Sequence, residues 1–216
     1  MSETSRAVSD ATFEYLAART AGDDDYLKDL KARAREASIP AIWISPEQAS
    51  FMSILLRVAG AREVIEVGTL GGYSAIAMAR ALPADGRVRT IELSDMHADF
   101  AEDAVENSDV AGRVEVHRGA GADVLPMFAD DSADAAFIDA DKEGYVTYVT
   151  ECLRIVRPGG LIMVDNAFAF GELLDSSSTD ASVLAVRAFN EHMAALEEVD
   201  AIIVPIGDGV WVGVRR

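Results

Sequence analysis

The sequence predicts an α/β fold, a doubly wound sheet of seven strands that ends in an antiparallel C-terminal hairpin. Five short apolar segments alternate with segments of helical periodicity, which is typical of parallel strands joined by right-handed crossovers with helices on both faces. The last two apolar segments, at 201–205 and 210–214, are separated only by the tight turn 206–209. That turn is too short for a crossover, so these two strands are expected to pair antiparallel.

Helical periodicity dominates the first sixty residues, at 7–19 and 26–37, and predicts an N-terminal helical extension. The acidic run 23–25 suits the start of the second helix, because acids there meet the positive end of the helix dipole. The next helix is expected to begin at Ser45, which can cap it, with a proline at the first helical position and Gln48 where a capping box requires it.

The remaining chain divides into strands and helices. Strands are expected at 64–67, 88–92, 114–117, 135–138, 161–164, 201–205 and 210–214. Helices are expected at 73–81, 96–108, 122–128, 145–156 and 183–196. In such a Rossmann-like sheet, ligands bind beyond the carboxyl ends of the parallel strands. No long linker divides the chain, so we expect a single domain with a helical cap at 1–44 and the Rossmann-like core at 45–216.

Charge and composition narrow the classes of function. The chain has 37 acidic and 19 basic residues and a formal net charge of −18. Such a surface repels polyanions, and no cluster of Lys and Arg offers a footprint, so we expect no nucleic-acid partner. No apolar run approaches the ~20 residues that cross a bilayer, so no membrane association is expected. The N-terminus lacks a signal core, and the single Cys152 cannot form an internal disulfide, which together favour the cytoplasm.

A glycine-rich turn follows the first predicted strand, with glycines at 68, 71 and 72. Their spacing matches neither the dinucleotide fingerprint nor a phosphate-cradling loop. Glu66, inside the strand before the first glycine, would repel phosphates and would suit a ligand with a positive amine. Glu92 ends the second strand, where a carboxylate can accept hydrogen bonds from both ribose hydroxyls; a helix cap is the alternative. A nucleoside with a cationic tail fits both, and S-adenosylmethionine is the economical candidate.

Polar residues also follow the fourth and fifth predicted strands. Asp139 follows one, and Asp165 with Asn166 follows the other. Neighbouring strands lie ~4.8 Å apart, so these oxygen atoms are expected to face one ion, although a simple turn is the alternative for Asp165 and Asn166. All-oxygen ligation favours Mg²⁺, Mn²⁺ or Ca²⁺ over zinc. Lys142 could take the proton of an acceptor hydroxyl, or it could be a surface lysine at a helix start.

These motifs resemble the class I methyltransferases that use S-adenosylmethionine, and within them the cation-dependent O-methyltransferase family that includes catechol and caffeoyl-CoA O-methyltransferases. The resemblance extends from about residue 44 to the C-terminus. It rests on ISPEQ at 44–48, EVGT at 66–69 with GYS at 72–74, FIDADK at 137–142, RPGG at 157–160 with DN at 165–166, and PIGDG at 205–209. It implies methyl transfer to a hydroxyl of a small catechol-like phenol by a homodimer.

The resemblance also implies a role for each matching residue. The metal, normally magnesium, would be held by Asp139, Asp165 and Asn166. Lys142 matches the catalytic base of the family. The cofactor pocket would comprise Ile44, Glu66, Gly68, Thr69, Ser74, Glu92, Gly121 and Asp141. Within that pocket, Glu92 would take the ribose and Gly121 would lie at the adenine.

Other functions stay open beside this one. Relatives of the family methylate hydroxyuridine in tRNA, but the acidic charge argues against that substrate. A nicotinamide-dependent dehydrogenase is opposed by the glycine spacing and by Glu66, and a non-catalytic cofactor-binding scaffold is opposed by the intact ligand set and Lys142.

Three features bear on the acceptor. Phe170 stands where plant members of the family have a residue that can bond polar substrate groups, which predicts a more apolar pocket and argues against a CoA ester. Asp208 is most simply a hairpin-turn residue, although in the family that turn lies near the acceptor mouth, and its role stays open. The histidines form no ligand spacing and are expected to be non-catalytic.

Overall fold

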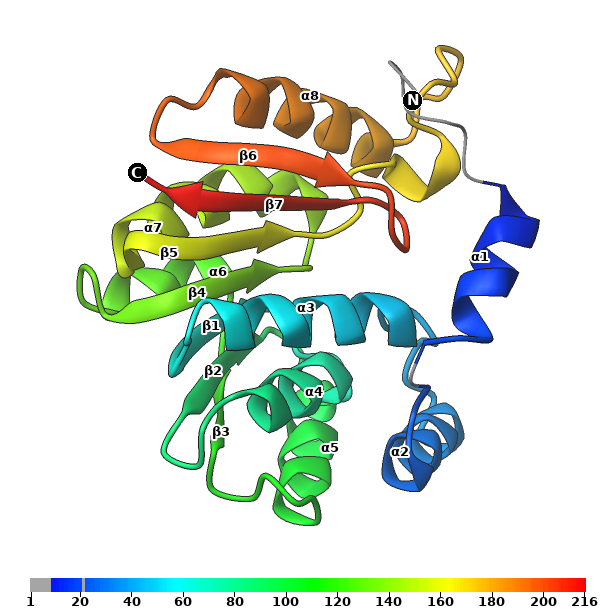
Figure 1. The fold of residues 1–216 in the computed structure, drawn as a ribbon, viewed down its shortest axis with the longest axis vertical. Helices are drawn as coiled ribbons and strands as arrows, with labels where there is room; N and C mark the ends of the chain where they lie inside the picture. The colour runs from blue at the N-terminus through cyan, green and yellow to red at the C-terminus, as the bar shows by residue number, and fades with distance from the viewer. Residues whose placement is uncertain (1–8, 21) are drawn as a thin grey trace.

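The computed structural model describes residues 9–20 and 22–216. The strands are β1 Glu63–Val67, β2 Arg87–Glu92, β3 Val114–Arg118, β4 Ala133–Ile138, β5 Val156–Val164, β6 Val199–Val204 and β7 Val210–Arg215. They form a seven-stranded sheet in the order β3-β2-β1-β4-β5-β7-β6 (Figure 1). Strands β1 to β5 are parallel, and β7 is antiparallel to both β5 and β6. The predicted doubly wound sheet with an antiparallel C-terminal hairpin is confirmed.

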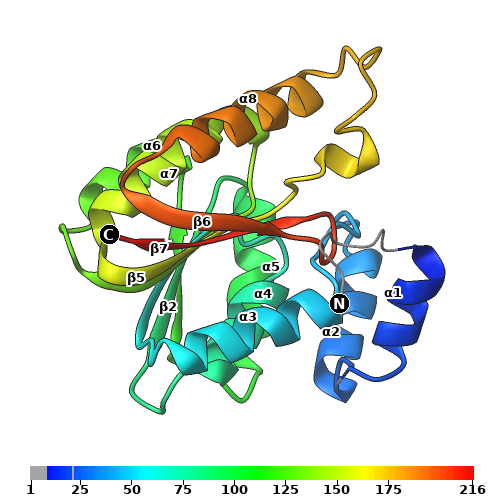
Figure 2. The ribbon, with the colours of Figure 1, turned by 45° about the horizontal axis from the view of Figure 1, so that its top comes forward.

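Helices cover both faces of this sheet, as predicted (Figure 2). The helices are α1 Asp10–Ala17, α2 Asp25–Glu36, α3 Pro46–Val58, α4 Tyr73–Ala81, α5 Asp95–Glu106, α6 Gly121–Val124, α7 Tyr145–Ile155 and α8 Ala181–Ala195, with short 3₁₀ turns η1 Leu125–Met127, η2 Lys142–Gly144 and η3 Ala169–Gly171. Along β4, Ala135 and Phe137 pack under α3 and α4, whereas Ala136 and Ile138 pack under α7 and α8. The central strands are therefore buried on both faces, as expected for parallel strands.

The N-terminal extension lies beyond the carboxyl ends of the parallel strands (Figure 1). The helix expected at 7–19 corresponds to α1, which begins at Asp10 after the extended N-cap Ser9; positions 7 and 8 of the expected range lie outside the described residues. Asp24 caps α2 by accepting a hydrogen bond from the Leu27 N–H at 2.9 Å, as the acidic run predicts. The division into a cap and a core remains a prediction. Within the described residues, no helix is both long and apolar enough to cross a membrane.

The expected capping box at α3 is half formed. Ser45 Oγ accepts from the Gln48 N–H at 3.2 Å, but the Gln48 side chain does not return to Ser45. Its Nε2 instead donates to Asp165 Oδ1 at 2.8 Å. The Gln48 side chain therefore binds the buried Asp165 carboxylate rather than the backbone of Ser45.

Some boundaries differ from the expected ones. Strand β5 begins at Val156 rather than at 161, because Val156 pairs with Ala133 across an irregularity in the register. The helix expected at 122–128 is α6 followed by η1, since the proline at 126 lacks the N–H that a continued α-helix would use.

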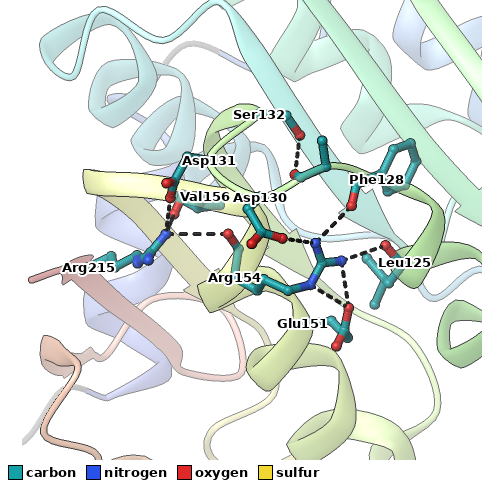
Figure 3. A network of polar contacts seen from close by, with 10 residues as sticks. Leu125, Phe128, Asp130, Asp131, Ser132, Glu151, Arg154, Val156 and Arg215 are labelled. Carbon is teal, nitrogen blue, oxygen red and sulfur yellow. Dashed lines mark hydrogen bonds and ion pairs between the residues drawn. The ribbon is translucent and has the colours of Figure 1, made fainter.

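Two guanidinium groups, of Arg154 and Arg215, bind the segments at the opposite end of the sheet, where β4 and β5 begin (Figure 3). Arg154 donates to the Phe128 carbonyl at 2.9 Å, to Asp130 at 2.6 Å and to Glu151 at 2.7 Å. Arg215 of β7 reaches the Arg154 carbonyl at 3.4 Å. This network anchors α7 and β5 at the end of the sheet that is remote from the glycine loop.

Candidate active site

The glycine loop after β1 is pressed against the end of β4. The Asp139 N–H donates to the Val67 carbonyl at 2.8 Å. A β-carbon at Gly68 would lie 1.9 Å from the Asp139 carbonyl oxygen, and the φ angle of Gly68 is +100°. Only glycine can therefore occupy this position without moving one of the two segments.

A cavity of about 670 Å³ opens at this edge of the sheet. The predicted site residues that line it are Ile44, Gly68, Thr69, Ser74, Glu92, Gly121, Asp139, Asp141, Lys142 and Asn166. The other two, Glu66 and Asp165, are buried and do not line it. The sequence did not assign Tyr73, His97 and Tyr148 to the cavity, yet they also line it.

Glu66 is completely buried, and neither of its carboxylate oxygens has a hydrogen-bond partner within the described part of the chain. Burial raises the pKa of Glu66 to about 8. Nearby hydroxyls of Ser74 and Thr90 partly offset that rise, and the charges of Asp139 and Glu92 add to it. A buried carboxylate without a partner is costly, so this group fits a ligand that brings a positive charge or a donor.

Glu92 has a structural role that the sequence did not predict. Its Oε2 accepts from the N–H groups of Thr69 at 3.2 Å and Leu70 at 2.8 Å. Its Oε1 accepts from the Ser94 N–H at 2.9 Å, and His97 Nδ1 lies 3.4 Å away. A carboxylate offers about four acceptor positions and three are used here, so Glu92 can hold the glycine loop and still accept from one ribose hydroxyl.

Asp141 is fixed by a tyrosine of α7. The Tyr148 hydroxyl donates to Asp141 Oδ1 at 2.6 Å, and burial followed by this bond raises the pKa of Tyr148, which stays neutral. A β-carbon at Gly121 would lie 2.8 Å from the Tyr148 ring, and one at Gly144 would lie 2.4 Å from it. Both glycines are thus required by the close approach of Tyr148.

The register of β4 and β5 brings the expected metal ligands together. Ile138 pairs with Val164, so Asp139 and Asp165 follow neighbouring positions at the same edge. Burial, and then the negative charge of Asp139, raises the pKa of the Asp165 carboxyl. Two carboxylates that repel each other, with the Asn166 amide beside them, are hard oxygen donors that suit a divalent cation.

This donor set is small. Across residues 9–20 and 22–216, no group of three or more His, Cys, Asp or Glu side chains could hold a metal ion. The set at the strand ends has two carboxylates and an amide, which leaves coordination positions for water or for substrate oxygens.

Lys142 lies between the acidic groups. Its Nζ donates to Asp139 Oδ1 at 3.1 Å, to the Ala140 carbonyl at 2.8 Å and to the Tyr145 hydroxyl at 2.7 Å. These three bonds use all the protons of an ammonium group. Burial, and then the surrounding carboxylates, raises the pKa of Tyr145, so its hydroxyl remains neutral. As an ammonium, Lys142 has no lone pair, so it must first lose one of these protons, and with it one of these bonds, before it can receive a proton.

Part of the cavity lining is apolar. Phe170, Ile42 and Trp43 line the cavity, and Phe170 and Ile42 are exposed to solvent. The Lys142 ammonium lies 5.8 Å from the centre of the Phe170 ring. This wall agrees with the apolar character expected from Phe170.

Known proteins share this fold. The O-methyltransferase family matches residues 17–216. A catechol O-methyltransferase of Niastella koreensis is 40% identical over 185 residues, 84% of each chain. The O-methyltransferase of Bacillus cereus, solved in complex with SAH, superposes with a TM-score of 0.86 and 36% identity, covering 95% of this chain and 97% of that one. The enzyme TomG of Streptomyces achromogenes, solved with SAM, gives 0.84 and 33%, covering 95% and 96%.

The chain belongs to the O-methyltransferase family, and it is an S-adenosylmethionine-dependent enzyme. This finding does not support the nicotinamide-dependent dehydrogenase alternative. It agrees with the resemblance drawn from the glycine loop and the two polar strand ends.

Proposed function

We propose that the enzyme transfers the methyl group of S-adenosylmethionine to one hydroxyl of a small catechol-like phenol, with the help of a divalent cation. The observation that carries this proposal is the pair of carboxylates, Asp139 and Asp165, that β4 and β5 bring to one edge of a cavity beside Lys142. The name of the Niastella koreensis relative, catechol O-methyltransferase, supports the same acceptor class.

Glu66 and its neighbours would hold the methionine part of the cofactor. The unpaired Glu66 carboxylate would meet the amine, with Thr69 of the glycine loop and Ser74 of α4 also lining the cavity. Glu92 would accept from a ribose hydroxyl at its remaining acceptor position while it keeps its bonds to the loop. Gly121 would lie at the adenine, and Asp141, held by Tyr148, would complete the pocket with Ile44.

The cation would be held by Asp139, Asp165 and Asn166, and magnesium is the expected ion, with manganese or calcium as alternatives. When bound, such an ion lowers the pKa of an acceptor hydroxyl and orients it. Because the protein would supply only three ligands, positions would remain for two adjacent oxygens of a vicinal diphenol and for water. Gln48 keeps the Asp165 carboxylate in place through its bond to Oδ1.

Lys142 would receive the proton of the acceptor hydroxyl. Its amine is held within reach of the strand ends by Asp139, the Ala140 carbonyl and Tyr145. Much of the remaining acceleration would come from positioning the acceptor oxygen in line with the sulfonium, with Phe170 and Trp43 excluding water.

Labelled methyl transfer tests this function. With labelled S-adenosylmethionine and Mg²⁺, catechol should be methylated, and phenol should react at least ~100-fold more slowly because it offers one oxygen instead of two. Equal rates for phenol and catechol would contradict the vicinal acceptor. Label in tRNA that carries hydroxyuridine, with catechol untouched, would favour the tRNA alternative instead. The homodimer and the cytoplasmic location remain predictions, and sedimentation velocity tests the first.

A further inference from the structure

The turn between β6 and β7 is bound to the loop that follows β5. The Ala167 N–H donates to the Gly209 carbonyl and the Phe168 N–H donates to the Asp208 carbonyl, each at 2.8 Å. The Asp208 side chain adds two bonds, because its Oδ2 accepts from Asn166 Nδ2 at 3.1 Å and from the Phe170 N–H at 2.8 Å. One carboxylate oxygen therefore contacts both a predicted metal ligand and the apolar wall of the cavity.

The hydrogen bond between Asp208 and Asn166 fixes which end of the Asn166 amide faces the carboxylate. An ionised carboxylate only accepts hydrogen bonds, so Asp208 selects the NH₂ end of the Asn166 amide. The carbonyl end of that amide, Oδ1, is then the atom left for a cation. If Asn166 turned over, its oxygen would face the Asp208 carboxylate, and its NH₂ group would face the cation.

The backbone of the loop after β5 also needs stabilising contacts from outside the loop. Asn166, Ala169 and Phe170 all have φ between 53° and 61°, the left-handed region that glycine prefers. Asparagine tolerates this conformation, but alanine and phenylalanine do so at a cost in free energy. Such backbone persists only where neighbouring groups enforce it, and the Asp208 bond to the Phe170 N–H is one such group.

A turn residue alone would not make these contacts. In a simple hairpin turn, the Asp208 side chain would bond within its own turn or face solvent. Here it is half-buried and bonds to residues that lie 38 and 42 positions earlier in the chain. The same turn also abuts Gln48, since a β-carbon at Gly207 would lie 2.2 Å from Gln48 Oε1.

We propose that Asp208 is a positioning residue, which orients the Asn166 amide toward the cation and holds Phe170 in the acceptor wall. The inference rests on the proposed cation site, and it links cation affinity and acceptor affinity to one side chain. Removal of Asp208 should therefore weaken both, whereas the S-adenosylmethionine pocket, which the glycine loop forms, should be unaffected.

The test measures Mn²⁺ binding by paramagnetic resonance, S-adenosylmethionine binding by calorimetry, and kcat and KM for catechol. For Asp208→Ala we expect about a 10- to 100-fold loss of Mn²⁺ affinity, a raised KM, and S-adenosylmethionine affinity within about twofold of the unmodified enzyme. Asp208→Asn keeps an acceptor oxygen and should recover part of the Mn²⁺ affinity. The control, Asp200→Ala, removes an exposed β6 carboxylate paired with Arg216 and should change none of these values.

A double mutant separates positioning from general loosening. In Asn166→Ala, the further change Asp208→Ala should cost little additional Mn²⁺ affinity, because the amide that it orients is gone. Unchanged Mn²⁺ affinity in Asp208→Ala, or fully additive losses in the double mutant, would overturn the proposal. Absence of Mn²⁺ binding in the unmodified enzyme would instead refute the cation site itself, and the proposal would fall with it.

Discussion

Glu66 is an acid that the fold buries completely and leaves without a hydrogen bond among the described residues. At most positions such a group would be selected against, because it weakens the ligand-free protein. Its place at the end of β1, beside the glycine loop, makes sense if the cofactor supplies the missing partner. Stability is then lower without the ligand and recovered when the ligand binds.

The pH dependence of stability tests this interpretation of Glu66. The folded protein keeps its proton up to a pKa of about 8, whereas the unfolded chain releases it near 4.5. The contribution of Glu66 therefore destabilises the ligand-free protein increasingly as pH rises through this window, by ~5 kcal/mol at most, and levels off above it. Urea unfolding should show that the unfolding free energy decreases less between pH 5 and pH 8 for Glu66→Gln than for the unmodified enzyme. An identical decrease in the two proteins would contradict the raised pKa.

Lys142 can act as a base or only as a charge, and two variants separate these roles. Lys142→Arg keeps a cation beside Asp139 but cannot readily give up a proton. If Lys142 receives the acceptor proton, both Lys142→Arg and Lys142→Ala should lower kcat by about 10²- to 10⁴-fold, with cofactor affinity nearly unchanged. Retention of most activity by the arginine variant alone would leave Lys142 a purely electrostatic role.

At the scale of elements, the carboxylate of Asp23, just before α2, links that helix to α4. Asp23 Oδ2 accepts from Lys31 Nζ, and Asp23 Oδ1 accepts from the Tyr73 hydroxyl, each at 2.6 Å. The Lys31 ammonium also lies 3.9 Å from the centre of the Tyr73 ring. Because Leu30 and Tyr73 line the cavity, this contact connects the N-terminal extension to cofactor binding.

Removal of the Asp23 carboxylate should lower both the stability of the protein and its affinity for the cofactor. Asp23→Ala leaves Lys31 buried without its anion, and we expect a loss of ~3 kcal/mol in unfolding free energy together with weaker S-adenosylmethionine binding. The matched control is Asp25→Ala, whose partner Lys28 is exposed and 3.6 Å away, and its effect should stay below ~1 kcal/mol. Equal effects of the two changes in urea unfolding would contradict the special role of Asp23.

The order and pairing of the elements could be predicted because both follow from local patterns. Apolar periodicity separates strands from helices, and the length of the turn 206–209 decides that β6 and β7 pair antiparallel. The diversion of Gln48 could not be predicted, since its acceptor, Asp165, lies 117 positions away. Local capping rules describe only the competition within one helix end.

The same limit applies within the site. Asp139, Asp165 and Asn166 could be placed together because each follows a strand, and the adjacency of β4 and β5 follows from the crossover. Tyr148 could not be placed, because no local pattern indicates that its hydroxyl reaches Asp141. The sequence shows only that Tyr148 lies three positions after Tyr145 on the same helix, which does not indicate a contact with Asp141.

At the scale of the whole molecule, one sheet carries all the strand ends that border the cavity. Helices on both faces bury the central strands, and Arg154 binds the segments at the opposite end of the sheet. The formal charge of −18 disfavours polyanions over the surface as a whole. A small neutral phenol and a divalent cation fit such a molecule better than RNA does.

Cation dependence tests the central claim most directly. Methyl transfer to catechol is measured on enzyme freed of metal with EDTA, before and after Mg²⁺ is restored, and in parallel on Asp139→Ala. The unmodified enzyme should lose activity in EDTA and regain it with Mg²⁺, whereas Asp139→Ala should stay inactive at any Mg²⁺ concentration while it still binds S-adenosylmethionine in calorimetry. Full activity in EDTA, on protein verified to be free of metal, would contradict the claim.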